Sequence, residues 1–91
     1  VINMIESEAL KIIQRPYITE KTFDIMEKQN KMVFIVEEKS SKYDIKNAIE
    51  LLYKVKVMTV RTTKTLQGKK AYIRFDAESS AAELASQLGV V

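Results

Sequence analysis

The chain has 91 residues and a net charge of +3, and it contains neither histidine nor cysteine. The commonest acid–base, nucleophilic and metal-binding side chains are therefore missing, and two glycines cannot form a glycine-rich phosphate loop, so we expect no catalytic residue, no metal site, no cofactor and no enzymatic activity. The length allows one hydrophobic core, which predicts a single domain over residues 1–91. No apolar run reaches membrane-spanning length, and the absence of cysteine fits a cytoplasmic protein.

Charge is segregated along the chain. Residues 1–38 carry five basic and seven acidic side chains, residues 39–74 carry ten basic and two acidic, and residues 75–91 carry three acidic and none basic. This pattern predicts that the middle of the chain faces a polyanion. The alternative is a solvated basic surface that binds nothing specific.

The N-terminal part predicts one strand and one helix. Residues 1–8 have no clean period and are expected to form a loose arm or a short helix, and Leu10 to Ile13 is an apolar run expected to form an edge strand that ends before Pro16. Thr19 is a good N-cap for a helix that runs to about Lys28 and ends at Gln29-Asn30, with an inner stripe that includes Phe23 and Met26.

Residues 31–36 (KMVFIV) are apolar on both faces, which predicts an interior strand. Ser41 and Asp44 resemble a capping box that opens a helix from Lys42 to Tyr53. The helix spacing places one apolar stripe on it, made of Ile45, Ala48, Ile49 and Leu52. One flank of that stripe is expected to extend a basic surface, and it consists of Lys42, Lys46 and Tyr53.

Residues 55–75 predict a hairpin of two strands joined by a turn at Leu66 to Lys69, with a bulge near Met58-Thr59. Ala71, Ile73 and Phe75 alternate with Lys70, Tyr72 and Arg74, so the second strand has an apolar and a polar face. The segment has no carboxylate and six cations: Lys56, Arg61, Lys64, Lys69, Lys70 and Arg74.

A last helix is expected after a capping box at Ser80 and Glu83, with Gly89 as its stop and Val90 folded back on its last turn. Its inner stripe is Ala81, Leu84, Ala85 and Leu88. The element order is β-α-β-α-β-β-α. This order predicts an α+β fold in which helices pack on a small, mostly antiparallel four-stranded sheet.

The hairpin favours RNA binding. Lys70 and Arg74 provide two phosphate-reaching cations around the stackable ring of Tyr72, and the hydroxyls of Thr62 and Thr63 can also bond phosphate. In the alternative without RNA binding, Tyr72 only covers the sheet and the lysines stay solvated. An RNA-recognition motif is disfavoured because residues 70–75 lack glycine and a second outward aromatic ring. A protein-interaction module that binds an acidic partner is the second functional hypothesis.

Two motifs resemble signatures of the universal large-subunit ribosomal protein twenty-three family. Residues 15–21 (RPYITEK) resemble its N-terminal signature and residues 69–74 (KKAYIR) its second signature, and the similarity extends from Leu10 to Val91. The resemblance implies a structural constituent of the large ribosomal subunit, bound to large-subunit rRNA at the peptide tunnel exit. It also implies contact with ribosomal protein twenty-nine and a docking site for the signal recognition particle.

The docking glutamate of bacterial members matches Glu20. Bacterial members have a long hairpin loop, whereas a few residues link the strands here, so the chain resembles the archaeal type and a role in trigger-factor binding is disfavoured. We expect no membrane insertion and no small-molecule substrate. The residues expected to bind rRNA are Lys42, Lys46, Lys56, Arg61, Thr62, Thr63, Lys64, Lys69, Lys70, Tyr72 and Arg74.

Overall fold

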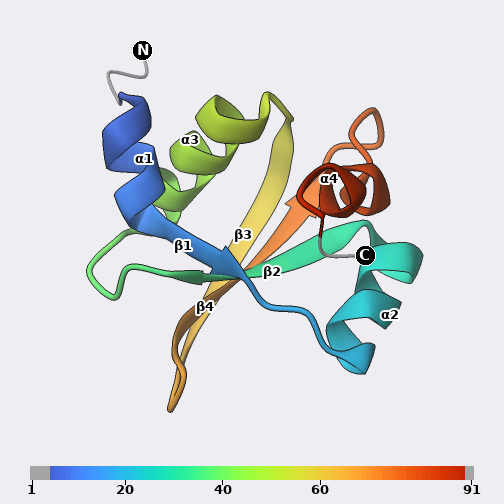
Figure 1. Cartoon of the computed structure of the whole chain (residues 1–91), viewed down its shortest axis with the longest axis horizontal. Coiled ribbons are helices and arrows are strands. Elements are labelled where there is room, and N and C mark those ends of the chain that lie inside the picture. Colours follow the sequence, from blue (N-terminus) through green and yellow to red (C-terminus); the bar gives the residue numbers. More distant parts are fainter. Residues whose placement is uncertain (1–4, 90–91) are drawn as a thin grey trace.

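The computed structural model describes residues 5–89 and has the expected α+β architecture (Figure 1). The predicted succession of strands and helices from the first strand onward is confirmed. The elements are α1 (Glu6–Ile12), β1 (Ile13–Pro16), α2 (Glu20–Gln29), β2 (Lys31–Val36), α3 (Lys42–Tyr53), β3 (Val57–Thr65), β4 (Gly68–Phe75) and α4 (Ala81–Gln87).

The four strands form one sheet in the order β1-β2-β4-β3, in which every neighbouring pair is antiparallel. The first strand lies at an edge, as predicted, and β2 is an interior strand with its last five residues buried. The register of β3 against β4 shifts between Val57 and Thr59, which is the predicted bulge. The turn of the hairpin is tighter than expected, because only Leu66 and Gln67 separate β3 from β4.

The predicted position of the first strand is wrong. Leu10, Lys11 and Ile12 belong to α1, and the strand begins at Ile13. Ala9 and Ile12, three residues apart, are buried, whereas Leu10 is 58% exposed, which is a helical pattern. A segment of four residues, three of them apolar, fits both periods, so contact of α1 with α3 decides the outcome. Residues 6–8 lie in α1, and residues 1–4 of the expected arm lie outside the described residues.

The predicted caps of α2 and α3 are confirmed. Thr19 accepts a hydrogen bond from the backbone N–H of Thr22, and Ser41 accepts one from that of Asp44 at 3.1 Å, each with a return bond that completes a capping box. The prediction that Phe23 lies on the inner stripe of α2 is wrong. Its side chain is 38% exposed, and Thr22 is buried with Met26 instead.

The start of α4 differs slightly from expectation. Ser80 accepts from the backbone N–H of Glu83 at 3.2 Å, but Glu83 makes no return bond to the Ser80 backbone, so the motif is a simple N-cap. Gly89 has φ +75°, a left-handed conformation that suits glycine after a helix. The expected packing of Val90 lies outside the described residues.

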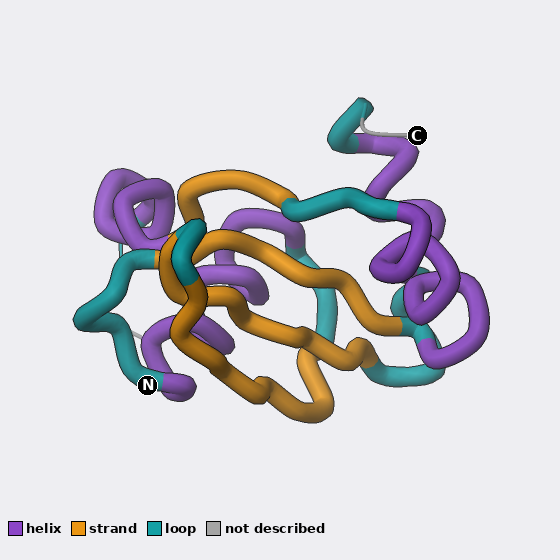
Figure 2. The backbone as a smooth tube through the Cα atoms, turned by 90° about the horizontal axis from the view of Figure 1, so that it is seen from below, coloured by secondary structure: helices purple, strands orange, loops and turns teal. Residues whose placement is uncertain are grey.

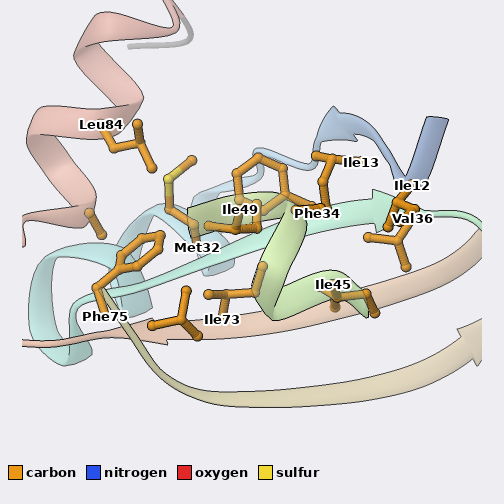
Figure 3. Packing of buried hydrophobic residues seen from close by; sticks show 14 of the residues in the cluster. Ile12, Ile13, Met32, Phe34, Val36, Ile45, Ile49, Ile73, Phe75 and Leu84 are labelled. Carbon is orange, nitrogen blue, oxygen red and sulfur yellow. The ribbon is translucent and has the colours of Figure 1, made fainter. Parts of the chain in front are cut away.

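The core lies between the helices and one face of the sheet (Figure 3). Met32, Phe34, Ile73 and Phe75 point from β2 and β4 toward α3 and α4, and each is almost fully buried. The Phe34 ring stacks on the Tyr53 ring, with centroids 6.1 Å apart. Figure 2 shows the strands crossing the middle of the molecule with helices at both ends. All four helices contribute side chains to this core, so it covers one face of the sheet and leaves the other to its own side chains.

Candidate nucleic-acid interface

The sheet has a second face, opposite the helices, which we call the outer face. Strand register assigns residues to it: Val33 and Arg61 both pair with Tyr72, and Ile35 and Thr63 both pair with Lys70. Val33 and Ile35 are buried but are not part of the core between sheet and helices. The outer face consists of Arg15, Lys31, Val33, Ile35, Thr59, Arg61, Thr63, Lys70, Tyr72 and Arg74.

The charged residues of the outer face are all positive. None of the four strands contains an aspartate or glutamate, so no carboxylate of the sheet itself neutralises these cations. Lys31 and Arg74 are directly paired across β2 and β4, although like charges in that position destabilise a sheet. Folding alone does not favour this arrangement, whereas a bound polyanion would stabilise it. The cations of the outer face are Arg15, Lys31, Arg61, Lys70 and Arg74.

Two tyrosines accompany these cations. Tyr72 is half-buried on β4, between Val33 and Arg61 in the register. Tyr17 follows β1, and its backbone N–H donates to the carbonyl of Val33 at 2.8 Å, which holds it beside β2. The ammonium of Lys70 lies 3.8 Å from the centroid of the Tyr17 ring, a cation–π contact that fixes Lys70 on the face.

A hollow of about 260 Å³ opens on this part of the sheet. It combines one aromatic ring, two cations and hydroxyl groups, which are the groups that bind bases and phosphates in RNA-binding proteins. The residues that line it are Lys31, Arg61, Thr62, Thr63 and Tyr72.

The cations of the hairpin strands lie on two sides of the sheet. Lys64 pairs with Lys69, and Lys69 pairs with Val36 of the core, so both lie on the helix side of the sheet. The Lys69 ammonium donates to the backbone carbonyls of Ser40 at 2.6 Å and Glu38 at 3.4 Å. Lys64 forms an exposed ion pair with Glu38 at 3.8 Å. These two lysines therefore join the hairpin to the loop that precedes α3.

The remaining predicted residues lie apart from the outer face. Lys42 and Lys46 are exposed on α3, which packs against the helix side, and Lys56 is exposed just before β3. Thr62 pairs with buried Ala71 and borders the hollow from the edge strand. Tyr53 does not extend a basic flank, because its ring stacks in the core; burial raises the pKa of its phenol above the usual value.

Glu20 is exposed and is the first residue of α2. Figure 1 shows α2 at one end of the sheet, away from the tip of the β3–β4 hairpin. The proposed factor-docking residue and the hairpin tip are therefore separate parts of the surface.

Sequence reasoning missed Arg15 and Lys31 of the outer face, and also Tyr17, which lies beside it. Lys31 alternates with Val33 and Ile35, so its side of β2 was available from the sequence. The sequence does not show that β2 and β4 are neighbours, and this pairing places Lys31 beside Arg74. Nothing in the residues around Tyr17 predicts its place beside the sheet, which depends on the contact with Val33.

Two kinds of feature are absent from residues 5–89. Within this range no helix is long and apolar enough to cross a membrane. The same residues include no cluster of three or more histidine, cysteine, aspartate or glutamate side chains placed to hold a metal ion.

Known proteins resemble this chain over most of its length. The family model described as ribosomal protein L23 matches residues 11–83. The large ribosomal subunit protein uL23 of Methanococcus aeolicus is 42% identical over 84 residues, which is 91% of this chain and 98% of that protein. The protein of the same name from Methanococcus vannielii is 43% identical with the same coverage. The Tetrahymena thermophila protein of that name is 46% identical over 81 residues, which are 88% of this chain and 54% of the Tetrahymena protein.

Proposed function

This chain belongs to the ribosomal protein L23 family, in its archaeal form, and is a constituent of the large ribosomal subunit, and we propose that it binds large-subunit rRNA through the outer face. The observation that carries the proposal is the composition of that face. Five cations and Tyr72 lie on a sheet whose strands contain no carboxylate, and Tyr17 lies beside them.

The outer-face cations account for affinity through counterion release. Each phosphate that a lysine or arginine neutralises contributes roughly 0.7–0.9 to the slope of log affinity against log salt. Arg61, Lys70 and Arg74 lie on adjacent strands, since β3 pairs directly with β4, so one RNA backbone can contact all three. Lys69 contributes less, because two carbonyls already accept hydrogen bonds from its ammonium.

The test compares two triple variants of equal charge. Arg61→Gln, Lys70→Gln and Arg74→Gln together should lower the salt slope for large-subunit rRNA by roughly 2–3 units. The control replaces Lys11, Lys21 and Lys39, which are exposed and lie outside the strands, with glutamine, and should leave the slope nearly unchanged. Equal slopes for both variants would rule out the outer face as the rRNA-binding surface.

The position on the ribosome is a second part of the proposal. We place the protein at the peptide tunnel exit, beside ribosomal protein twenty-nine. Support for this comes from similarity to proteins of the large subunit over 91% of the chain. Sedimentation of the tagged protein with the large subunit at physiological salt is the check. A protein that stays at the top of the gradient would instead favour the module that binds an acidic protein partner.

Glu20 is proposed to contact the signal recognition particle. Its carboxylate is exposed in the first turn of α2, inside the motif that resembles the family's N-terminal signature. A photoreactive amino acid at position 20 should crosslink to the particle on translating ribosomes, whereas one at Lys28, in the last turn of the same helix, should crosslink much less. Equal crosslinking from both positions would remove the specific role of Glu20.

A further inference from the structure

The hollow on the outer face is suited to one flat ring. Its volume of about 260 Å³ is below the roughly 300–1,000 Å³ of pockets that enclose a drug-sized ligand. Arg61 is directly paired with Tyr72 across β3 and β4, and Lys31 approaches from β2 on the other side of β4. The hollow therefore presents an aromatic ring between two cations.

Tyr72 is the tyrosine available for stacking. The ring of Tyr17 already has the Lys70 ammonium against its face, at 3.8 Å from its centroid. Tyr72 lines the hollow and is only half-buried, so part of its side chain remains accessible to a ligand. The two rings thus have different tasks: Tyr17 holds a cation in place, and Tyr72 offers an aromatic surface.

A fully paired RNA helix cannot use this hollow well. Its bases are stacked on each other, and it presents phosphates and sugars to an exposed sheet. Contacts to phosphate need cations but need no ring and no recess. An unpaired base that leaves the helix offers a flat ring between two phosphates, which matches an aromatic surface between two cations.

We propose that the hollow binds one unpaired base of the RNA, stacked on Tyr72, while Lys31 and Arg61 hold the phosphates on its two sides. The inference rests on the proposed function, and it specifies that the rRNA segment on the outer face contains a bulged or looped-out nucleotide. Thr63 also lines the hollow, and its hydroxyl can donate a hydrogen bond to the base edge or accept one from it.

The experiment uses two short RNA hairpins of the same stem sequence, one fully paired and one with a single bulged adenosine. Stacking on an aromatic side chain tolerates any base, so the probe does not need to be the natural rRNA sequence. The full-length protein should bind the bulged hairpin at least about fivefold more tightly in fluorescence anisotropy, the lower end of the effect of one base–aromatic stack. Tyr72→Phe should keep this preference, and Tyr72→Leu should abolish it.

Tyr43→Leu is the matched control, because Tyr43 is 65% exposed on α3 and lies outside the sheet. It should keep the preference for the bulged hairpin. A second readout uses the absence of tryptophan from the sequence: in Tyr72→Trp, the fluorescence of the introduced ring should be quenched by the bulged hairpin and not by the paired one. This variant keeps a large ring beside Val33, its neighbour on β2, and does not depend on how well Tyr72→Leu folds.

Three results are distinguishable. Equal affinity of the wild-type protein for both hairpins, or a preference that survives Tyr72→Leu, would overturn the unpaired-base site and leave rRNA binding by the cations intact. Equal quenching by both hairpins would do the same. No binding to either hairpin, together with no binding to large-subunit rRNA, would overturn the proposed function itself.

Discussion

Asn30 offers a quantitative test of how the ends of three elements are joined. It is the left-handed C-cap of α2, with φ 54° and ψ 42°. Its side-chain amide donates to the carbonyls of Phe75 at 3.3 Å, Asp76 at 3.2 Å and Ser79 at 2.7 Å, and its oxygen accepts from the N–H of Ala81, the first residue of α4, at 2.7 Å. One side chain thus connects α2, β4 and α4.

The expected effect of Asn30→Gly follows from counting these bonds. The amide has two hydrogens for three carbonyls, so two donated bonds and one accepted bond are lost, at about 1 kcal/mol each. Glycine keeps the left-handed backbone conformation without steric cost. We expect the free energy of unfolding to fall by about 3 kcal/mol, a large part of the roughly 5–15 kcal/mol typical of a domain. Urea unfolding followed by circular dichroism measures it.

Lys54 provides a matched control. It caps α3 with the same φ of 54°, and no side-chain hydrogen bond of Lys54 is found in the described residues. Lys54→Gly relieves a left-handed non-glycine residue but adds freedom to the unfolded chain, and these terms of roughly 1 kcal/mol oppose each other. It should therefore change stability by less than about 1 kcal/mol. If Asn30→Gly cost no more than Lys54→Gly, the side-chain bonds of Asn30 would not hold α4, and the reasoning would be refuted.

Three other changes test single contacts. Glu50→Ala should cost about 1–2 kcal/mol in urea unfolding, because its carboxylate accepts from the N–H of Val57 at the bulge at 3.0 Å, and Glu50→Gln should recover part of the loss; equal losses would show that the acceptor is not important. Lys69→Met should speed hydrogen exchange of the amides at residues 38–41, because it removes the hydrogen bond to the carbonyl of Ser40. Unchanged exchange there would show that this hydrogen bond does not stabilise the loop. Burial raises the pKa of the Tyr53 phenol above 10.0. The neutral phenol therefore contributes stability below pH 10, and this contribution is lost as the pH rises through the raised pKa of the folded state. Tyr53→Phe should lose less stability than wild type above pH 10, and identical pH profiles of the two proteins would contradict this.

Local patterns were sufficient where several signals agreed. The helix from Lys42 to Tyr53 has a cap, a polar first turn and an apolar stripe that all specify the same element, and its bounds were predicted correctly. The strict alternation in β4 correctly assigned Ala71 and Ile73 to the core and Tyr72 to the other face. In such segments each residue's neighbours along the chain carry enough information.

Local patterns failed where one short segment fitted two periods. Leu10 to Ile13 is apolar enough for a strand, but packing of Ala9 and Ile12 against α3 makes most of it helical. Phe23 was expected on the inner stripe of α2 with Met26, yet α2 packs with Thr22 and Met26 buried and Phe23 exposed. Both outcomes depend on contacts between elements distant in sequence, which no window of the chain contains.

The sequence by itself determined that the chain is an α+β domain with a basic, carboxylate-free hairpin, because composition and alternation are local properties. Only the tertiary structure decided which cations act together. Placing β4 between β2 and β3 brings Lys31 and, from β1, Arg15 onto the face of Tyr72. The pleat of the same strands turns Lys64 and Lys69 to the helix side. The physical reason is that side-chain parity is set within a strand, whereas the neighbours of a side chain are set by strand order and register.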